Sequence, residues 1–163
     1  MRLSTKGRYA VMAMVDLAKH SGGQPVVLAD IAERQAISLS YLEQLFAKLR
    51  NAGLVKSVRG PGGGYLLGHG GDGTRISDII LAVDEPIRAT RCSPGAPMGC
   101  SGSTTRCLTH DLWEELGNQI HLYLSSVTLA DVCAQRVLGL SGVIHRAARS
   151  PIDADSERPA LTQ

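Results

Sequence analysis

The spacing of hydrophobic residues over the first 53 positions predicts three consecutive helices. Apolar residues recur at intervals of three and four over residues 8–20, and the turn-forming "GGQPV" interrupts this pattern. The segment "LADIAERQAIS" then predicts a short second helix. A third helix follows directly in "SYLEQLFAKLRNAGLV", and its hydrophobic stripe consists of Leu42, Leu45, Phe46 and Leu49.

The two ends of the third helix carry capping signals. We expect Ser40 and Glu43 to form a capping box, in which the hydroxyl and the carboxylate each accept a hydrogen bond from a backbone N–H group at the helix start. Ser38 is a competing candidate for the N-cap. Gly53 stands where a helix C-terminal glycine belongs, because glycine adopts a positive φ at little cost.

The hydrophobic pattern changes its period after Gly53. The segment "LVKSVRGPGGGYLLG" predicts two short strands joined by the glycine-rich turn at residues 60–64. Two helices around a tight turn, followed by a β-hairpin, have the element order of a winged helix-turn-helix domain. The predicted fold class is therefore mainly α, with a winged helix-turn-helix DNA-binding domain at residues 1–68.

The second half of the chain divides into shorter segments. Residues 69–90 predict a linker with a flexible glycine-rich joint, followed by the short helix "ISDIILAVDEP". Residues 91–110 form a loop, and residues 111–140 predict a long dimerisation helix and a short terminal helix capped by Thr128 and Asp131. Residues 141–163 contain few large apolar side chains and are expected to form a disordered tail.

Charge is distributed unevenly along the chain. Residues 1–68 contain nine basic and four acidic residues, a net charge of +5, whereas the remainder contains eight basic and eleven acidic residues, a net charge of −3. A basic first half favours contact with a polyanion. No apolar run approaches the roughly 18 residues that a membrane-spanning helix needs, and Asp16 interrupts the one near the N-terminus. We expect a cytoplasmic protein with no membrane partner.

The third predicted helix is the candidate for reading double-stranded DNA in the major groove. Gln44 can bond adenine at two positions, Glu43 can accept from the cytosine amino group, and serines at a helix start can bind phosphate. Arg59, at the edge of the hairpin tip, is a candidate for the minor groove. The expected DNA-binding residues are Ser38, Ser40, Tyr41, Glu43, Gln44, Lys56 and Arg59. Lys48 also belongs to the exposed set of this helix, and Arg8 and Arg50 are candidates for further phosphate contacts. The alternatives are an ordinary solvated helix face or a winged helix that binds protein.

The loop "RCSPGAPMGCSGSTTRCLTH" holds three of the four cysteines and ends in a histidine. Cys92, Cys100, Cys107 and His110 make a complete set of four ligands, separated by seven, six and two residues. Clustered cysteines in a cytosolic chain favour a metal or redox site over structural disulfides. Such a set can bind zinc or an iron–sulfur cluster, and the long glycine-rich spacers favour the larger binuclear cluster. Free thiols or a reversible disulfide are the alternative.

Two further observations limit the chemistry. Cys133 lies between Val132 and Ala134 on an apolar helical segment, and we interpret it as a small buried hydrophobic residue. A redox enzyme has no support from a C-x-x-C pair, a nucleotide-binding loop or a catalytic dyad. We therefore expect a protein that is not an enzyme.

Several of these segments occur together in one known family. "MRLSTKGRYAV", "ISLSYLEQLFAKLRNAGLVKSVRGPGGGYLL" and "CLTH" resemble the bacterial iron–sulfur cluster regulators of the IscR family, from Met1 to about Ser141. Related winged-helix repressors share the first part only. The resemblance to the Cys3His loop ending in "CLTH" is the narrower signal.

The resemblance implies a homodimeric transcription factor with a 2Fe–2S cluster as its cofactor. Its ligands are then Cys92, Cys100, Cys107 and His110. The cluster-assembly machinery is the implied cluster donor, and the loaded protein is expected to repress the cluster-assembly operon while the apo form acts at other promoters. A zinc-stabilised winged-helix DNA-binding protein without cluster sensing is the alternative.

Overall fold

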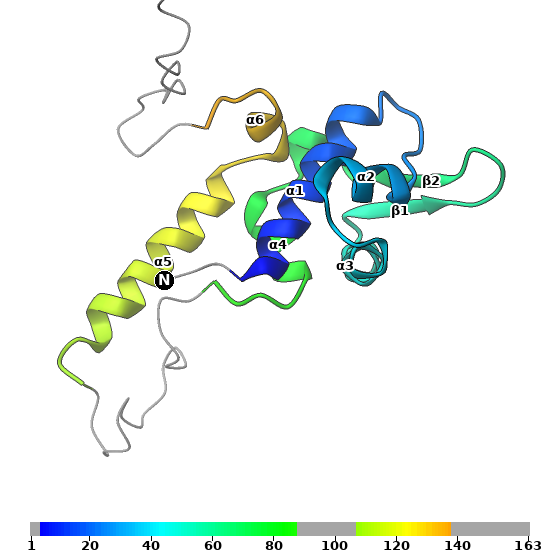
Figure 1. The fold of residues 1–163 in the computed structure, drawn as a ribbon. Coiled ribbons are helices and arrows are strands. Elements are labelled where there is room, and N and C mark those ends of the chain that lie inside the picture. Colours follow the sequence, from blue (N-terminus) through cyan, green and yellow to red (C-terminus); the bar gives the residue numbers. More distant parts are fainter. Residues whose placement is uncertain (1–3, 88–106, 138–163) are drawn as a thin grey trace, which may run out of the picture.

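The computed structural model describes residues 4–87 and 107–137. The fold is mainly helical with one small sheet, as the hydrophobic pattern predicts. The described elements are α1 (Thr5–His20), α2 (Leu28–Gln35), α3 (Leu39–Asn51), β1 (Val55–Val58), β2 (Gly64–Leu67), the 3-10 helix η1 (Gly71–Gly73), α4 (Ile76–Ala82), α5 (His110–Ser126) and α6 (Leu129–Cys133). The β1–β2 hairpin and α5 extend on opposite sides of the helical core (Figure 1).

Helix α1 is the centre of the core. It contacts α2, α3, α4 and α6, and Ala10, Ala13, Met14 and Leu17 are completely buried along it. The stripe predicted on α3 is buried as well, with Phe46 and Leu49 fully inaccessible to solvent. Full burial of a side chain of this size contributes about 1.5–3 kcal/mol, so the α1–α3 contact is a main source of stability.

A buried carboxylate joins α1 to α2. Asp16 is 3% exposed, and both of its oxygens accept hydrogen bonds from Arg34 Nε at 3.1 Å. Arg34 Nη2 donates to Asp16 at 2.6 Å and the Gln35 amide donates at 2.7 Å. Burial alone raises the pKa of Asp16, but the hydrogen bonds from Arg34 and Gln35 and the Arg34 charge bring this pKa below its ordinary value. The orientation of α2 on α1 is therefore set by a charged pair.

Helix α3 begins earlier than its sequence suggests. Its N-cap is Ser38, whose backbone is extended, and the first helical residue is Leu39. The expected capping box of Ser40 and Glu43 is therefore wrong, since Ser40 lies inside the first turn, and the Ser38 side chain makes no capping hydrogen bond. The burial of Ile37 at 5% exposure fixes the chain just before the helix and explains this boundary. Gly53, at φ 76°, follows the helix as predicted.

The hairpin predicted after Gly53 is present as the wing, residues 55–67. Its strands pair antiparallel with Val55 opposite Leu67 and Val58 opposite Gly64. A bridge between Val26 and Tyr65, with N–H···O distances of 2.9 and 2.8 Å, joins the wing to the segment before α2. At Gly64 a Cβ atom would collide with the backbone of Val26, so only glycine permits this approach.

The segment expected to be a flexible joint is packed against α6. Thr74 is fully buried, and its carbonyl accepts a hydrogen bond from Leu129 N–H at 2.9 Å. Ile76 N–H donates to the Val127 carbonyl at 3.1 Å, and Arg75 bridges to Thr128. The glycine content of this segment predicted a flexible joint. The prediction missed these contacts because they join residues more than 50 positions apart. The predicted capping box of Thr128 and Asp131 is confirmed at the start of α6.

Helix α4 ends at Ala82, before the limit suggested by Pro86. Asp84 adopts a left-handed φ of 57°, and the N–H groups of Asp84 and Glu85 donate back to Leu81 and Ile80. This is the hydrogen-bond pattern of a Schellman motif. Glu85 then accepts hydrogen bonds from the backbone N–H and the hydroxyl of Ser4, the N-cap of α1.

Helix α5 has an apolar face that is partly covered by the core near its C-terminal end. Tyr123 and Leu124 pack against the core, whereas Leu112, Trp113 and Leu116 are 62%, 42% and 40% exposed. Among the described residues, no helix is both long and apolar enough to span a bilayer. The expected tail at residues 141–163 lies outside the described part of the chain.

Candidate nucleic-acid interface and metal centre

The start of α3 presents a polar face to solvent. Ser38, Ser40, Glu43 and Gln44 are exposed, and Tyr41 is half-buried because its ring packs edge-on against Tyr9, with 6.1 Å between centroids. The Glu43 side chain makes no hydrogen bond or ion pair with any other described residue, and its expected role as a cap is excluded. The five side chains therefore lie where a duplex could reach them.

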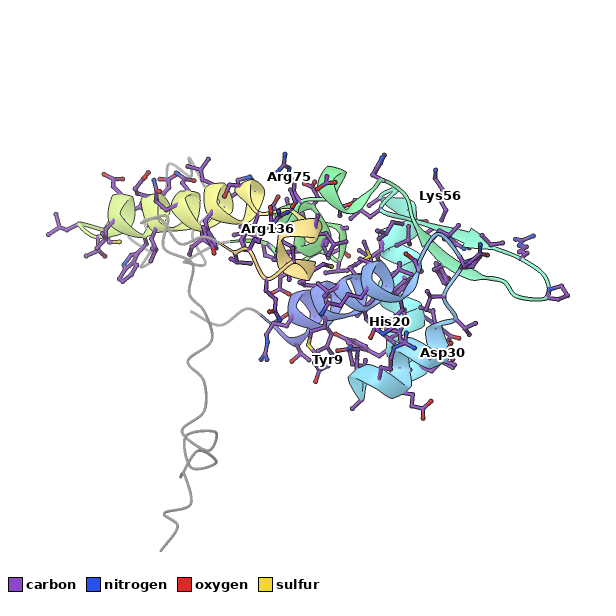
Figure 2. All side chains as sticks on the ribbon, turned by 90° about the horizontal axis from the view of Figure 1, so that it is seen from above. Tyr9, His20, Asp30, Lys56, Arg75 and Arg136 are labelled. Carbon is purple, nitrogen blue, oxygen red and sulfur yellow. The ribbon has the colours of Figure 1, made fainter. Side chains whose placement is uncertain are left out.

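The wing brings a second set of polar side chains to the same end of the molecule. Lys56 is exposed on β1 and projects outward from the strand (Figure 2). Arg59 is exposed in the turn that follows β1, and Figure 1 shows the hairpin beside α2 and α3. The bridge between Val26 and Tyr65 and the 5.0 Å ring contact of Phe46 with Tyr65 hold the wing against these helices. The position of the wing relative to α2 and α3 is therefore fixed by these contacts.

Three other basic residues differ in their surroundings. Arg8 and Arg50 are exposed. Lys48, expected to be exposed with the polar face of α3, is half-buried and its Nζ lies 2.6 Å from Asp84 Oδ2. This hydrogen bond lowers the pKa of Asp84 and raises the pKa of Lys48. Lys48 thus connects α3 to the end of α4, a contact that links residues 36 positions apart.

The expected metal ligands are only partly described. Cys92 and Cys100 lie outside the described residues, whereas Cys107 and His110 are described at the start of α5. The Cys107 carbonyl accepts a hydrogen bond from His110 N–H at 3.0 Å, so these two ligands share one turn. The Cys107 thiol is half-exposed and lies 3.7 Å from the Thr109 hydroxyl. A soft thiolate and an imidazole in one turn fit zinc or an iron–sulfur cluster.

Cys133 is the cysteine that the sequence pattern excluded from the ligand set. It is the last residue of α6. It is half-buried against the core, and its thiol lies 3.9 Å from the Val15 carbonyl. Burial raises the pKa of this thiol. Because the thiolate is the form that binds metal, a raised pKa makes Cys133 a poor ligand.

The structure adds one residue near the ligand turn that sequence reasoning missed. Glu114 Oε2 lies 3.3 Å from His110 Nε2, and the His110 side chain is 4% exposed. The ligand atoms of His110, Asp111 and Glu114 all lie within 4.8 Å of one another. The four-residue interval between His110 and Glu114 on a predicted helix was the signal that could have found this pair.

Comparison with known proteins identifies the family of this chain. The model of the Rrf2 family, described as iron-dependent transcriptional regulators, matches residues 3–135. The chain belongs to the Rrf2 family. It is 58% identical over 132 residues to the HTH-type transcriptional regulator IscR of Yersinia pseudotuberculosis, covering 81% of this chain and 79% of the relative. It is 57% identical over 143 residues to IscR of Photorhabdus laumondii, covering 87% and 85% of the two chains.

Solved structures of two Rrf2-type regulators share the fold. IscR of T. potens has a TM-score of 0.66 at 42% identity, with 82% of this chain and 87% of that chain covered. CymR, the global cysteine regulator of B. subtilis, has a TM-score of 0.67 at 38% identity, with 82% and 97% covered. The expected resemblance to IscR is confirmed, and the chain is a transcriptional regulator that binds DNA.

Proposed function

We propose that this Rrf2-family chain senses iron–sulfur cluster status through a 2Fe–2S cluster held by Cys92, Cys100, Cys107 and His110. The observation that carries the proposal is the single turn at the start of α5 that unites Cys107 with His110 through their backbone hydrogen bond. The 57–58% identity to IscR and the iron-dependent description of the family support it. The cluster-assembly machinery supplies the cluster, and the loaded protein represses the operon that encodes this machinery, while the apo form acts at other promoters.

The acting species is a homodimer. Leu112, Trp113 and Leu116 present an apolar face that is exposed along α5. An equivalent helix of a second copy would bury this face, and a two-fold dimer matches a two-fold DNA site.

The proposed DNA contacts divide by chemistry. Ser38 and Ser40 bind phosphate at the start of α3, and Tyr41 borders them. Glu43 and Gln44 read base edges: Gln44 pairs with adenine, while the carboxylate of Glu43 accepts from cytosine and is repelled by the acceptor atoms of guanine. Lys56 and Arg59 bind the backbone or the narrow groove from the wing, outside the major groove.

The ligand set couples to the DNA-binding half through described contacts. When bound, the cluster supplies four metal–ligand bonds that tie the loop to α5. Helix α5 contacts α4, and the residues that follow α4 bind Lys48 of α3 and Ser4 of α1. A change at the start of α5 would therefore reach the recognition helix α3 through Asp84, and α1 through Glu85.

Visible absorption of protein purified without oxygen tests the proposal. A binuclear cluster gives a coloured protein, whereas zinc and free thiols absorb no visible light. Cys92→Ala, Cys100→Ala and Cys107→Ala are each expected to abolish the absorption, while the control Cys133→Ala leaves it unchanged. A colourless parent with one equivalent of zinc would support the zinc-stabilised regulator instead. Bleaching by Cys133→Ala but not by Cys107→Ala would overturn the ligand assignment.

A further inference from the structure

Helix α5 begins with a histidine–carboxylate pair. His110 Nε2 and Glu114 Oε2 are 3.3 Å apart, and their side chains are 4% and 32% exposed. The contact has the distance of an ion pair but lacks hydrogen-bond geometry, so Glu114 acts on the buried Nε2 through its charge. Residues four positions apart lie on the same face of a helix, so the helix itself holds this pair together.

The chemistry of the pair selects one nitrogen of the imidazole. A carboxylate only accepts hydrogen bonds, and a neutral imidazole carries its single proton on one of its two nitrogens. With Glu114 beside Nε2, the favoured tautomer has the proton on Nε2 and the lone pair on Nδ1. A metal ligand needs that lone pair, and metal-bound histidines commonly donate their other N–H to a carboxylate.

We propose that Glu114 is a positioning residue that holds the Nε2–H tautomer of His110 and thereby assigns Nδ1 as the nitrogen that binds the metal centre. The inference deepens the proposed function and rests on His110 being a ligand. The nearby negative charge also makes the imidazole a stronger electron donor, which stabilises the oxidised centre. Glu114 thus affects both the orientation of the ligand and the ease with which the centre is reduced.

Two acidic residues next to this pair, Asp111 and Glu115, serve as comparisons for Glu114. Asp111 belongs to the same group of atoms within 4.8 Å, so it is the rival for the positioning role. Glu115 follows Glu114 in sequence, but its Oε1 accepts a hydrogen bond from the Gln119 amide at 2.6 Å. Glu115→Gln therefore removes the same charge from the same helix without touching His110, and Asp111→Asn tests the rival.

The first experiment reads the tautomer of His110 in the full-length apo protein. Long-range proton–nitrogen NMR distinguishes the protonated ring nitrogen, and the His110 signal is assigned by its loss in His110→Asn. We expect the Nε2–H form in the parent, Glu115→Gln and Asp111→Asn, and a shift toward the Nδ1–H form in Glu114→Ala. Glu114→Gln, whose amide can also donate, should lie between. An unchanged tautomer in Glu114→Ala overturns the proposal.

The second experiment uses anaerobically purified, loaded protein. Glu114→Ala is expected to raise the midpoint potential and to increase the rate of cluster loss to a chelator by roughly 10-fold, within the range known for such supporting partners. Pulsed EPR on the reduced centre with nitrogen-labelled histidine should report Nδ1 ligation in the parent. Nε2 ligation in the parent, or equal potentials in Glu114→Ala and Glu115→Gln, contradicts the proposal.

The two experiments separate two kinds of failure. A parent that never gains visible absorption refutes the cluster, and the NMR result then still decides whether Glu114 sets the His110 tautomer. If the parent is coloured but Glu114→Ala changes neither the His110 tautomer nor the midpoint potential, only the positioning role is refuted. The proposed function is then unaffected.

Discussion

The two long helices α1 and α5 have similar hydrophobic patterns and opposite surroundings. Along α1, Ala13, Met14 and Leu17 are completely buried by other parts of the same chain. Along the first half of α5, Leu112 and Trp113 are 62% and 42% exposed. An apolar stripe thus predicts that a helix forms and that its face needs cover, but not which molecule supplies the cover. We call the DNA-binding half, whose α1 is covered by its own chain, the complete half. We call α5, whose exposed face the proposed dimer would cover, the incomplete half.

The largest expected effect is on the complete half. Asp16→Asn removes the charge that holds Arg34 and Gln35, and we expect the free energy of unfolding to fall by about 2–4 kcal/mol. The pKa of Asp16 is lowered in the folded protein, so the ionised carboxylate stabilises the parent above about pH 4. The difference between parent and variant should therefore shrink as the pH falls below that value.

Urea denaturation at several pH values measures this effect. Asp30→Asn is the matched control, since Asp30 is an exposed residue of α2, and Figure 2 shows it projecting from the helix. Equal stability of the Asp16 and Asp30 variants at pH 7 would show that the charged pair does not hold α2 on α1.

The sequence predicted most elements of the complete half because their signals are local. The stripe of α3, the helix-ending Gly53 and the turn between the strands each depend on residues a few positions apart. The capping box was wrong because two serines compete at the helix start, and the burial of Ile37 decides between them. No local signal points to the contacts of Asp16 with Arg34 or of Lys48 with Asp84, since each joins separate elements.

For the candidate site, the sequence predicted the residue types but not all of their contacts. Its residue types, three thiols and an imidazole, were visible in the sequence, and so was the polar start of α3. The partner of His110 was not foreseen, because glutamate four residues into a helix is also an ordinary solvated side chain. Burial of the imidazole, which only the packed structure gives, is what distinguishes the two cases.

The second expected effect tests the incomplete half. Trp113→Ala removes the largest side chain of the exposed α5 face, and we expect the dissociation constant of the proposed dimer to rise about 30-fold or more. The unfolding midpoint of the DNA-binding half should change little, because Trp113 is exposed and does not belong to the core around α1. Analytical ultracentrifugation over a range of concentrations measures the assembly.

Asn118→Ala is the control for this experiment, since Asn118 is exposed on the opposite side of the helix. A dimer that survives Trp113→Ala and also Leu116→Asp would place the interface elsewhere on the molecule.

The smallest effect concerns the wing. Arg59→Ala should reduce affinity for DNA and flatten its salt dependence by about one phosphate equivalent if the guanidinium contacts backbone. If Arg59 reads bases, the loss should instead vary with sequence by roughly 5- to 100-fold. Titrations of labelled duplexes at several salt concentrations distinguish the two results. Affinity that is unchanged for every duplex would exclude Arg59 from the interface.

The length of α5 has a mechanical consequence. Its 17 residues span about 25 Å, from His110 at one end to the other end beside Val127, whose carbonyl accepts from the first residue of α4. A tilt of about 5° at the α4 end displaces the far end by about 2 Å, so the helix acts as a lever. Metal–ligand bonds tolerate only a few tenths of an ångström, so ligation of His110 in the proposed cluster would fix the angle at the opposite end to about one degree. Ligand bonds at one end of α5 would in this way set the geometry of a rigid joint at the other.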